Sequence, residues 1–290
     1  MTAAARPAPP STAEIAAAEA LAAQLPALAL AAERLARSLA PGRHGRRRAG
    51  TGEQFWQYRD VRQGDPRSAV DWRRSARGDR LYLREREWQI VATLALDIAD
   101  DASMRWRSSP AVPEKWQHAA LLGLATAQLA LAGGERVTLL DRGRPVAGRG
   151  ALDRLAANLA LPAAAPRPAR GRIALFGDFL DPPETIADRL RPLTAAARGG
   201  VLVQILDPAE CDFPFHGRVL FEDVGASQAA QAEDIAKAES VAPAYRARIA
   251  AQREQVARIA REAGLIPIVH RTDAPAAPCL VAIRAALEPG

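Results

Sequence analysis

Acidic side chains follow several predicted strands at the points where those strands end. Asp97 closes one apolar run, Asp101 and Ser103 follow it closely, and Asp178 comes directly after a second apolar run. In a mainly parallel sheet, the loops beyond the carboxyl ends of neighbouring strands gather at one edge. Carboxylate and hydroxyl oxygens are the ligands that Mg²⁺ prefers in proteins. Asp97, Asp101, Ser103 and Asp178 are therefore candidate ligands of a magnesium ion.

The same acids have a second interpretation. A carboxylate at the start of a helix accepts hydrogen bonds from the first backbone amides and favours the positive end of the helix dipole. Asp207 and Glu210, which follow a third strand, also fit this description. Both interpretations stay open at the level of sequence. No histidine joins the set, so a zinc site is not expected.

Other catalytic patterns are missing from the sequence. It contains no G-x-x-x-x-G-K-[ST], no G-x-S-x-G and no H-E-x-x-H motif. Its four histidines are scattered, and we interpret each as a surface or packing residue. Cys211 lies between Glu210 and Asp212, and neighbouring acids raise the pKa of a thiol. We therefore expect a protein that is not an enzyme. A Mg²⁺-dependent hydrolase using Asp97, Asp101 and Asp178 is the least favoured alternative, because no general base accompanies them.

The composition is that of a globular protein with excess arginine. The 290 residues include 39 Lys+Arg and 33 Asp+Glu, a net charge of +6, and only Lys115 and Lys237 are lysines. Alanine and arginine enrichment is typical of a GC-rich genome, while a polyanion partner is the alternative reading of the charge. The two cysteines form no disulfide framework and fit a reducing compartment. Charged residues interrupt the apolar stretch 15–40, so we expect no membrane span and a cytoplasmic location.

From residue 89 onward, apolar strands alternate with amphipathic helices. This alternation predicts an α/β fold with a doubly wound, mainly parallel sheet and helices on both faces. The strands are expected at 89–96, 136–140, 172–176, 201–206 and 266–269, and the helices at 114–131, 152–161, 183–198, 244–263 and 278–287.

The composition changes twice before this region. Residues 1–40 are rich in alanine and have leucines at helical spacing, which predicts an N-terminal helix. Residues 41–88 contain almost no alanine and concentrate Arg, Asp, Gly and aromatic residues. Here 53–59 and 80–87 are expected to be strands of a small hairpin, separated by turns. The expected organisation is thus a helical segment (1–40), a signature subdomain (41–88) and an α/β domain (89–290).

The hairpin region carries a long spaced motif, G-x-x-F-x-x-x-R-x-Y/V-x-x-G-D-x-x-R-x-I/V-D-W-x-x-S-A-R, followed by V/L-R-E-x-E. It resembles the signature of a bacterial family of uncharacterised proteins usually encoded beside MoxR-type AAA+ ATPases. The motif positions that are candidates for interaction are Arg59, Gly64, Asp65, Arg67, Asp71, Trp72, Ser75, Arg77, Arg84 and Glu85. The resemblance continues through Asp178 and residues 207–223 to the C-terminus.

This resemblance implies a von Willebrand factor A-like domain. In that fold a metal-ion-dependent adhesion site uses D-x-S-x-S after the first strand, a Thr on a second loop and an Asp on a third. Asp178 fits the third loop. However, aligning Asp97 puts Ala99 at the first Ser, and the stretch 143–150 contains no Thr. The resemblance therefore implies a degenerate site, with no cofactor required and Mg²⁺ doubtful.

The leading hypothesis is a non-enzymatic adaptor that acts with a MoxR-type AAA+ ATPase on client proteins. An alternative explanation of the motif is structural: its Arg–carboxylate pairs would only fix the hairpin on the sheet. A second functional hypothesis is nucleic-acid binding, in which Arg46–Arg48 contact phosphates and Trp56 and Tyr58 stack on bases. Acids interleaved among the arginines weigh against it. The client, the process and the oligomeric state are not identified by the sequence.

Overall fold

The structure is a computed structural model that describes residues 12–39, 55–60, 70, 72–76, 81–86, 93–222 and 232–288. The chain forms two compact units, one of residues 1–42 with 92–290 and the other of residues 43–91. The N-terminal helix is thus grouped with the larger unit. The signature region is an insertion between this helix and the first strand of the main sheet.

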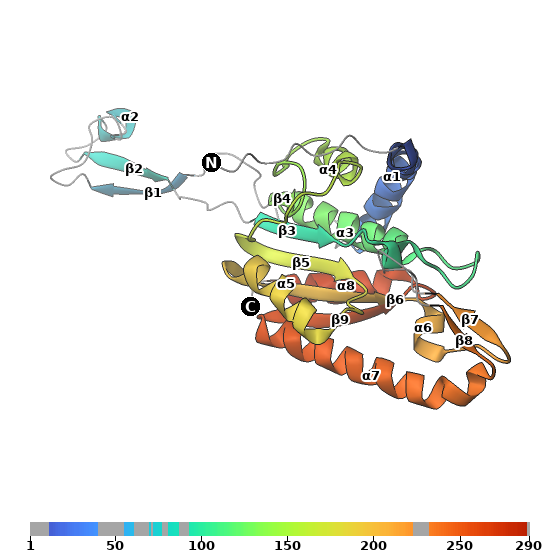
Figure 1. Cartoon of the computed structure of the whole chain (residues 1–290). Coiled ribbons are helices and arrows are strands. Elements are labelled where there is room, and N and C mark those ends of the chain that lie inside the picture. Colours follow the sequence, from blue (N-terminus) through green and yellow to red (C-terminus); the bar gives the residue numbers. More distant parts are fainter. Residues whose placement is uncertain are drawn as a thin grey trace, which may run out of the picture. The chain divides into compact units, whose positions relative to one another are not determined.

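Five parallel strands form the sheet of the larger unit (Figure 1). In spatial order they are β4 (Arg136–Leu139), β3 (Thr93–Ile98), β5 (Gly171–Gly177), β6 (Ala197–Leu206) and β9 (Leu265–Arg271). Numbered along the chain, this is the order 2-1-3-4-5, a doubly wound arrangement whose direction reverses between β3 and β5. The predicted α/β fold with a mainly parallel sheet is confirmed.

Helices cover both faces of this sheet (Figure 1). One face carries α3 (Lys115–Ala132) and α8 (Ala276–Leu287), and the other carries α5 (Pro183–Thr194) and α7 (Ala238–Glu262). The strands are buried on both sides, which is why they read as continuous apolar runs and not as alternating patterns. Each face has its own hydrophobic core, centred on Phe176 and Trp116 under α3 and on Leu175 and Leu202 under α5 and α7.

Two further helices pack on the face of the sheet that carries α3. They are α1 (Thr12–Leu39) and α4 (Ala151–Leu159). In the part of α1 whose burial is described, residues 23–39, the buried side chains are Leu25 and the alanines Ala29, Ala32 and Ala36. These small side chains let the α1 backbone approach α3, α4 and α8 closely. No helix in the described part of the chain is long and apolar enough to cross a membrane.

Short elements at the carboxyl end of the sheet were not predicted. They are the 3-10 helix η2 (Ala102–Arg105), α6 (Pro208–Asp212) and the hairpin of β7 (Val219–Phe221) and β8 (Glu233–Ile235). The helix predicted at 183–198 is also wrong at its end, since α5 stops at Thr194 and β6 already begins at Ala197. Pairing with β5 extends β6 backward through a stretch that reads as helical in isolation.

The smaller unit contains the predicted hairpin. β1 (Phe55–Asp60) pairs antiparallel with β2 (Tyr82–Arg86), and the one-turn helix α2 (Trp72–Ser75) lies between them in the sequence. Ser75 is buried, and its Oγ accepts a hydrogen bond from the backbone amide of Tyr82 at 2.9 Å. This bond ties α2 to the start of β2.

Candidate functional site

The loops after β3, β5 and β6 meet at one edge, because these strands are parallel neighbours in the sheet. There the side chains of Asp101, Ser103, Lys115, Asp178 and Glu210 form a connected group, the Lys115 cluster. The Lys115 ammonium donates to Asp178 Oδ2 at 2.9 Å and to Glu210 Oε1. The Ser103 hydroxyl lies 2.6 Å from the same Asp178 oxygen and 2.7 Å from Asp101 Oδ1.

Lys115 is the centre of this cluster, and its side chain is only 1% exposed. Burial by itself lowers the pKa of an ammonium group, but the carboxylates of Asp178 and Glu210 outweigh it and raise the pKa of Lys115 above its ordinary value. Lys115 is therefore a buried, permanently charged cation. Burying an ammonium this deeply costs free energy, and its ion pairs and hydrogen bonds to Asp178 and Glu210 offset that cost.

Helix starts place the members of the cluster. Asp101 is the N-cap of η2, and its Oδ1 accepts from the Met104 amide at 3.2 Å. Asp207 caps α6 through the Ala209 amide at 2.8 Å, and Glu210 Oε2 accepts from the Asp207 amide in return. The capping interpretation of the strand-end acids is therefore confirmed for Asp101 and Asp207. The Asp101 carboxylate both caps η2 and contacts Ser103 of the cluster.

The Asp178 loop is held in an uncommon backbone conformation. Phe179 has φ of 49°, in the left-handed region that non-glycine residues seldom adopt. Gln204 of β6 donates to the carbonyl of Asp178 at 2.9 Å. Gln252 of α7 donates to the carbonyls of Phe179 at 3.2 Å and Asp181 at 2.8 Å. These bonds fix the turn that presents the Asp178 carboxylate to Lys115.

Asp97 is the predicted ligand that does not join the cluster. Successive side chains of a strand point to opposite faces, and Ala95, two residues earlier, packs in the core under α5 and α7. Asp97 shares that face, where its Oδ2 accepts from Arg189 of α5 at 2.7 Å. Burial raises the pKa of the Asp97 carboxyl, and Arg189 opposes that rise. Of the four predicted magnesium ligands, the structure thus brings together Asp101, Ser103 and Asp178.

The Lys115 cluster does not fit a divalent ion. Mg²⁺ would need the oxygens of Ser103 and Asp178 at about 2.0–2.1 Å, and the ammonium of Lys115 already contacts the same Asp178 oxygen. Two cations at such short range repel strongly where water is excluded. Within the described residues, moreover, no group of three His, Cys, Asp or Glu side chains could hold a metal ion.

Two histidines expected to be scattered lie together in the fold. His118 Nδ1 of α3 is 2.7 Å from His270 Nε2 of β9, and both rings are buried. One of these two nitrogens must carry a hydrogen and donate the hydrogen bond, and the other must accept it. Burial lowers the pKa of His118, and burial together with His118 lowers the pKa of His270 to about 4. The pair is therefore a neutral hydrogen-bonded link between α3 and the edge strand.

The signature positions divide into three groups. The backbones and side chains of Trp72 and Ser75 are both described, and their exposure differs. Ser75 is buried, at 6% exposed, whereas Trp72 is 58% exposed. Arg59 lies on β1, and Arg84 and Glu85 lie on β2, where their backbones are described and their side chains are not. The positions outside the described residues are Gly64, Asp65, Arg67, Asp71, Arg77 and the Arg46–Arg48 cluster.

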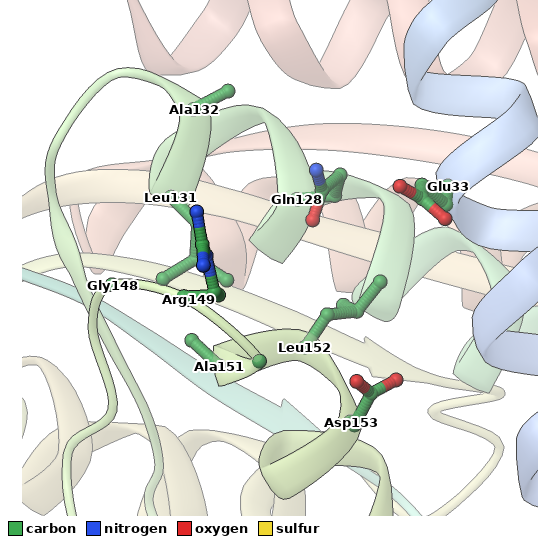
Figure 2. A pocket seen from close by; sticks show the side chains of 10 residues that line it. Glu33, Gln128, Leu131, Ala132, Gly148, Arg149, Ala151, Leu152 and Asp153 are labelled. Atoms are coloured by element: carbon green, nitrogen blue, oxygen red, sulfur yellow. The ribbon is translucent and has the colours of Figure 1, made fainter.

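A separate pocket of 280 Å³ opens at the opposite end of α3 (Figure 2). Figure 2 shows Arg149 between the end of α3 and the start of α4. Because α3 rises 1.5 Å per residue, this pocket lies about 20 Å along the helix from Lys115. It is lined by Glu33, Gln128, Leu131, Ala132 and residues 148–153. The pocket is therefore no part of the Lys115 cluster.

Comparison with known families bears on both units. The family described as "Protein of unknown function DUF58" matches residues 57–255, more than half of the chain. The chain belongs to the DUF58 family. The DUF58 match begins in β1 and ends in α7, so it includes Trp72 of the signature and every member of the Lys115 cluster. The chain matches no curated protein and no solved structure in the same comparisons.

Sequence reasoning missed the residue at the centre of this DUF58 site. Lys115 stands out only as one of two lysines among 39 basic residues, at the start of a helix that follows an acidic loop. Its partners lie 63 and 95 positions away in the chain, so no local motif contains them. The cluster connects the loops after β3, β5 and β6 through one buried cation.

Proposed function

We propose that this DUF58 protein is a cytoplasmic, non-enzymatic adaptor that binds a MoxR-type AAA+ ATPase and presents client proteins to it. The observation that carries the proposal is the exposure of Trp72 in the signature unit. A tryptophan whose only role was to fix the hairpin would be buried against it. Trp72 instead leaves 58% of its surface exposed.

Exposed tryptophan is the residue type most suited to a protein contact. Trp is enriched among the few interface residues that carry most of the binding energy, because its large rigid ring buries much area at little entropic cost. Leu81 of the same unit is also exposed, by 48%, and Arg73 adds an exposed positive charge. The signature unit thus combines an aromatic side chain, an aliphatic side chain and a charge on its surface.

The larger unit supports an interaction role over a catalytic one. We assign to it a von Willebrand factor A-like architecture, which the doubly wound sheet and the polar loops at its carboxyl ends support. In this reading, the Lys115 cluster stabilises the loops that a partner contacts and performs no reaction.

The test uses the full chain and the MoxR-type ATPase encoded in the same genome. Both are purified, mixed and analysed by size-exclusion chromatography with light scattering, and ATP turnover is measured with and without the chain. A stable complex and a changed rate of ATP turnover are expected. Separate elution together with unchanged turnover would reject the proposal.

A further inference from the structure

The resemblance to von Willebrand factor A domains leads one to expect a divalent ion between the loop after β3 and the loop of Asp178. The Lys115 ammonium is bound there instead. It shares Asp178 Oδ2 with the Ser103 hydroxyl, and Ser103 in turn binds Asp101. The ammonium therefore neutralises and joins the oxygens that an ion would join, with Glu210 as an additional partner.

The start of α3, which carries Lys115, is held in place by its own contacts. Lys115 is the first residue of α3, and a reciprocal capping box between Glu114 and Gln117 fixes that end of the helix. Trp116, the next residue, is 1% exposed, and the Arg105 guanidinium lies 4.1 Å from the centre of its ring. Movement of this helix start away from Asp178 would require exposure of Trp116.

We infer that Lys115 is a built-in cation that replaces a divalent ion in organising the Asp101, Asp178 and Glu210 loops. The wild-type edge of the sheet is then independent of metal. Removal of the ammonium leaves the Asp178 and Glu210 carboxylates and the Ser103 hydroxyl without a counter-charge, and these are oxygen donors of the kind that Mg²⁺ and Mn²⁺ prefer. This inference concerns the isolated chain and holds whether or not the chain binds an ATPase.

The experiment compares the full chain with its Lys115→Met variant, and uses Lys237→Met as the matched control because Lys237 is exposed. Binding of Mn²⁺ is followed by the loss of its free-ion paramagnetic resonance signal, and thermal unfolding is recorded in Mg²⁺ and in EDTA. We expect Lys115→Met to bind Mn²⁺ at least about tenfold more tightly than wild type. Its melting temperature should rise with Mg²⁺, whereas wild type and Lys237→Met should respond to neither Mg²⁺ nor EDTA.

A further variant, Lys115→Met with Asp178→Asn, should lose the new Mn²⁺ binding. The inference is overturned if wild type binds Mn²⁺ saturably and Asp178→Asn abolishes that binding. A folded Lys115→Met variant that binds Mn²⁺ no more tightly than wild type also overturns it. If Lys115→Met does not fold alone, folding restored by Mn²⁺ supports the inference, and an unfolded chain with and without Mn²⁺ contradicts it.

Discussion

At the scale of single residues, the two lysines of the chain have opposite environments. Lys237 is exposed, whereas Lys115 is buried and contacts two carboxylates. A buried ion pair is weak evidence for stability, because desolvation offsets the attraction. Loss of one partner is different, since it leaves the remaining charges buried and uncompensated. The Lys115 cluster should therefore tolerate the loss of its cation poorly.

The first prediction follows from this asymmetry. Lys115→Met should lower the free energy of unfolding by about 3–5 kcal/mol in metal-free buffer. Lys237→Met should change it by less than about 0.5 kcal/mol. Urea unfolding followed by circular dichroism measures both values. Equal, small effects of the two substitutions would show that Lys115 is not held as a buried charge.

The second prediction concerns the His118–His270 pair. The pKa of His270 falls from 6.5 in the unfolded chain to about 4 in the folded chain, because of burial first and His118 second. Between these values the unfolded chain binds more protons, so stability is full above pH 6.5 and falls as the pH decreases toward 4. In this range, titration of His270 should lower the free energy of unfolding by about 1.4 kcal/mol for each pH unit of decrease.

The matched variant for this measurement is His270→Gln, which does not titrate. Urea unfolding of wild type and variant at pH 7, 6 and 5 separates the histidine from the carboxylates, which titrate in both proteins. The curve of the variant should be flatter than that of wild type over this range. Parallel curves would mean that the two rings are not buried as a neutral pair.

At the scale of elements, Gly200 determines how closely β6 pairs with β5. A Cβ at this position would lie 1.9 Å from the carbonyl oxygen of Ile173. The third prediction is that Gly200→Ala costs about 3 kcal/mol of stability, since a backbone atom must move. Gly148→Ala is the control: its φ is 73° but nothing lies within 4 Å of the added Cβ, so about 1 kcal/mol is expected. Chemical denaturation checks both, and a Gly200→Ala chain as stable as the control would contradict this account of the strand pair.

The alternation of strands and helices was predictable because each long element buries a continuous apolar run or stripe. Their ends were less predictable. The end of α5 depends on the pairing of β6 with β5, and η2 and α6 depend on caps supplied by Asp101 and Asp207. The acids of the site were found from their positions at strand ends. Lys115 was not, because its role depends on partners brought together only by the fold.

At the scale of the whole molecule, the chain divides into two units. The larger unit contains the sheet and the Lys115 cluster, and the smaller unit, inserted between α1 and β3, contains the signature hairpin. Insertions of this kind are tolerated where the host fold closes without them. Here α1 packs on α3, α4 and α8 independently of the insertion, and the Arg284 side chain of α8 donates to the carbonyl of Leu39 at the end of α1. Under the adaptor proposal, the signature unit is the part of the chain that contacts the ATPase.

The most direct test of the adaptor proposal is the affinity of the full chain for the ATPase with and without the Trp72 ring. Isothermal titration calorimetry should give a saturable complex for wild type, weakened at least about tenfold by Trp72→Ala, as for a residue at the centre of an interface. Leu161→Ala is the control, because Leu161 is exposed to a similar degree, 47%, in the larger unit; its affinity should equal that of wild type. Equal affinities for Trp72→Ala and Leu161→Ala, or no complex with wild type, would contradict the proposal.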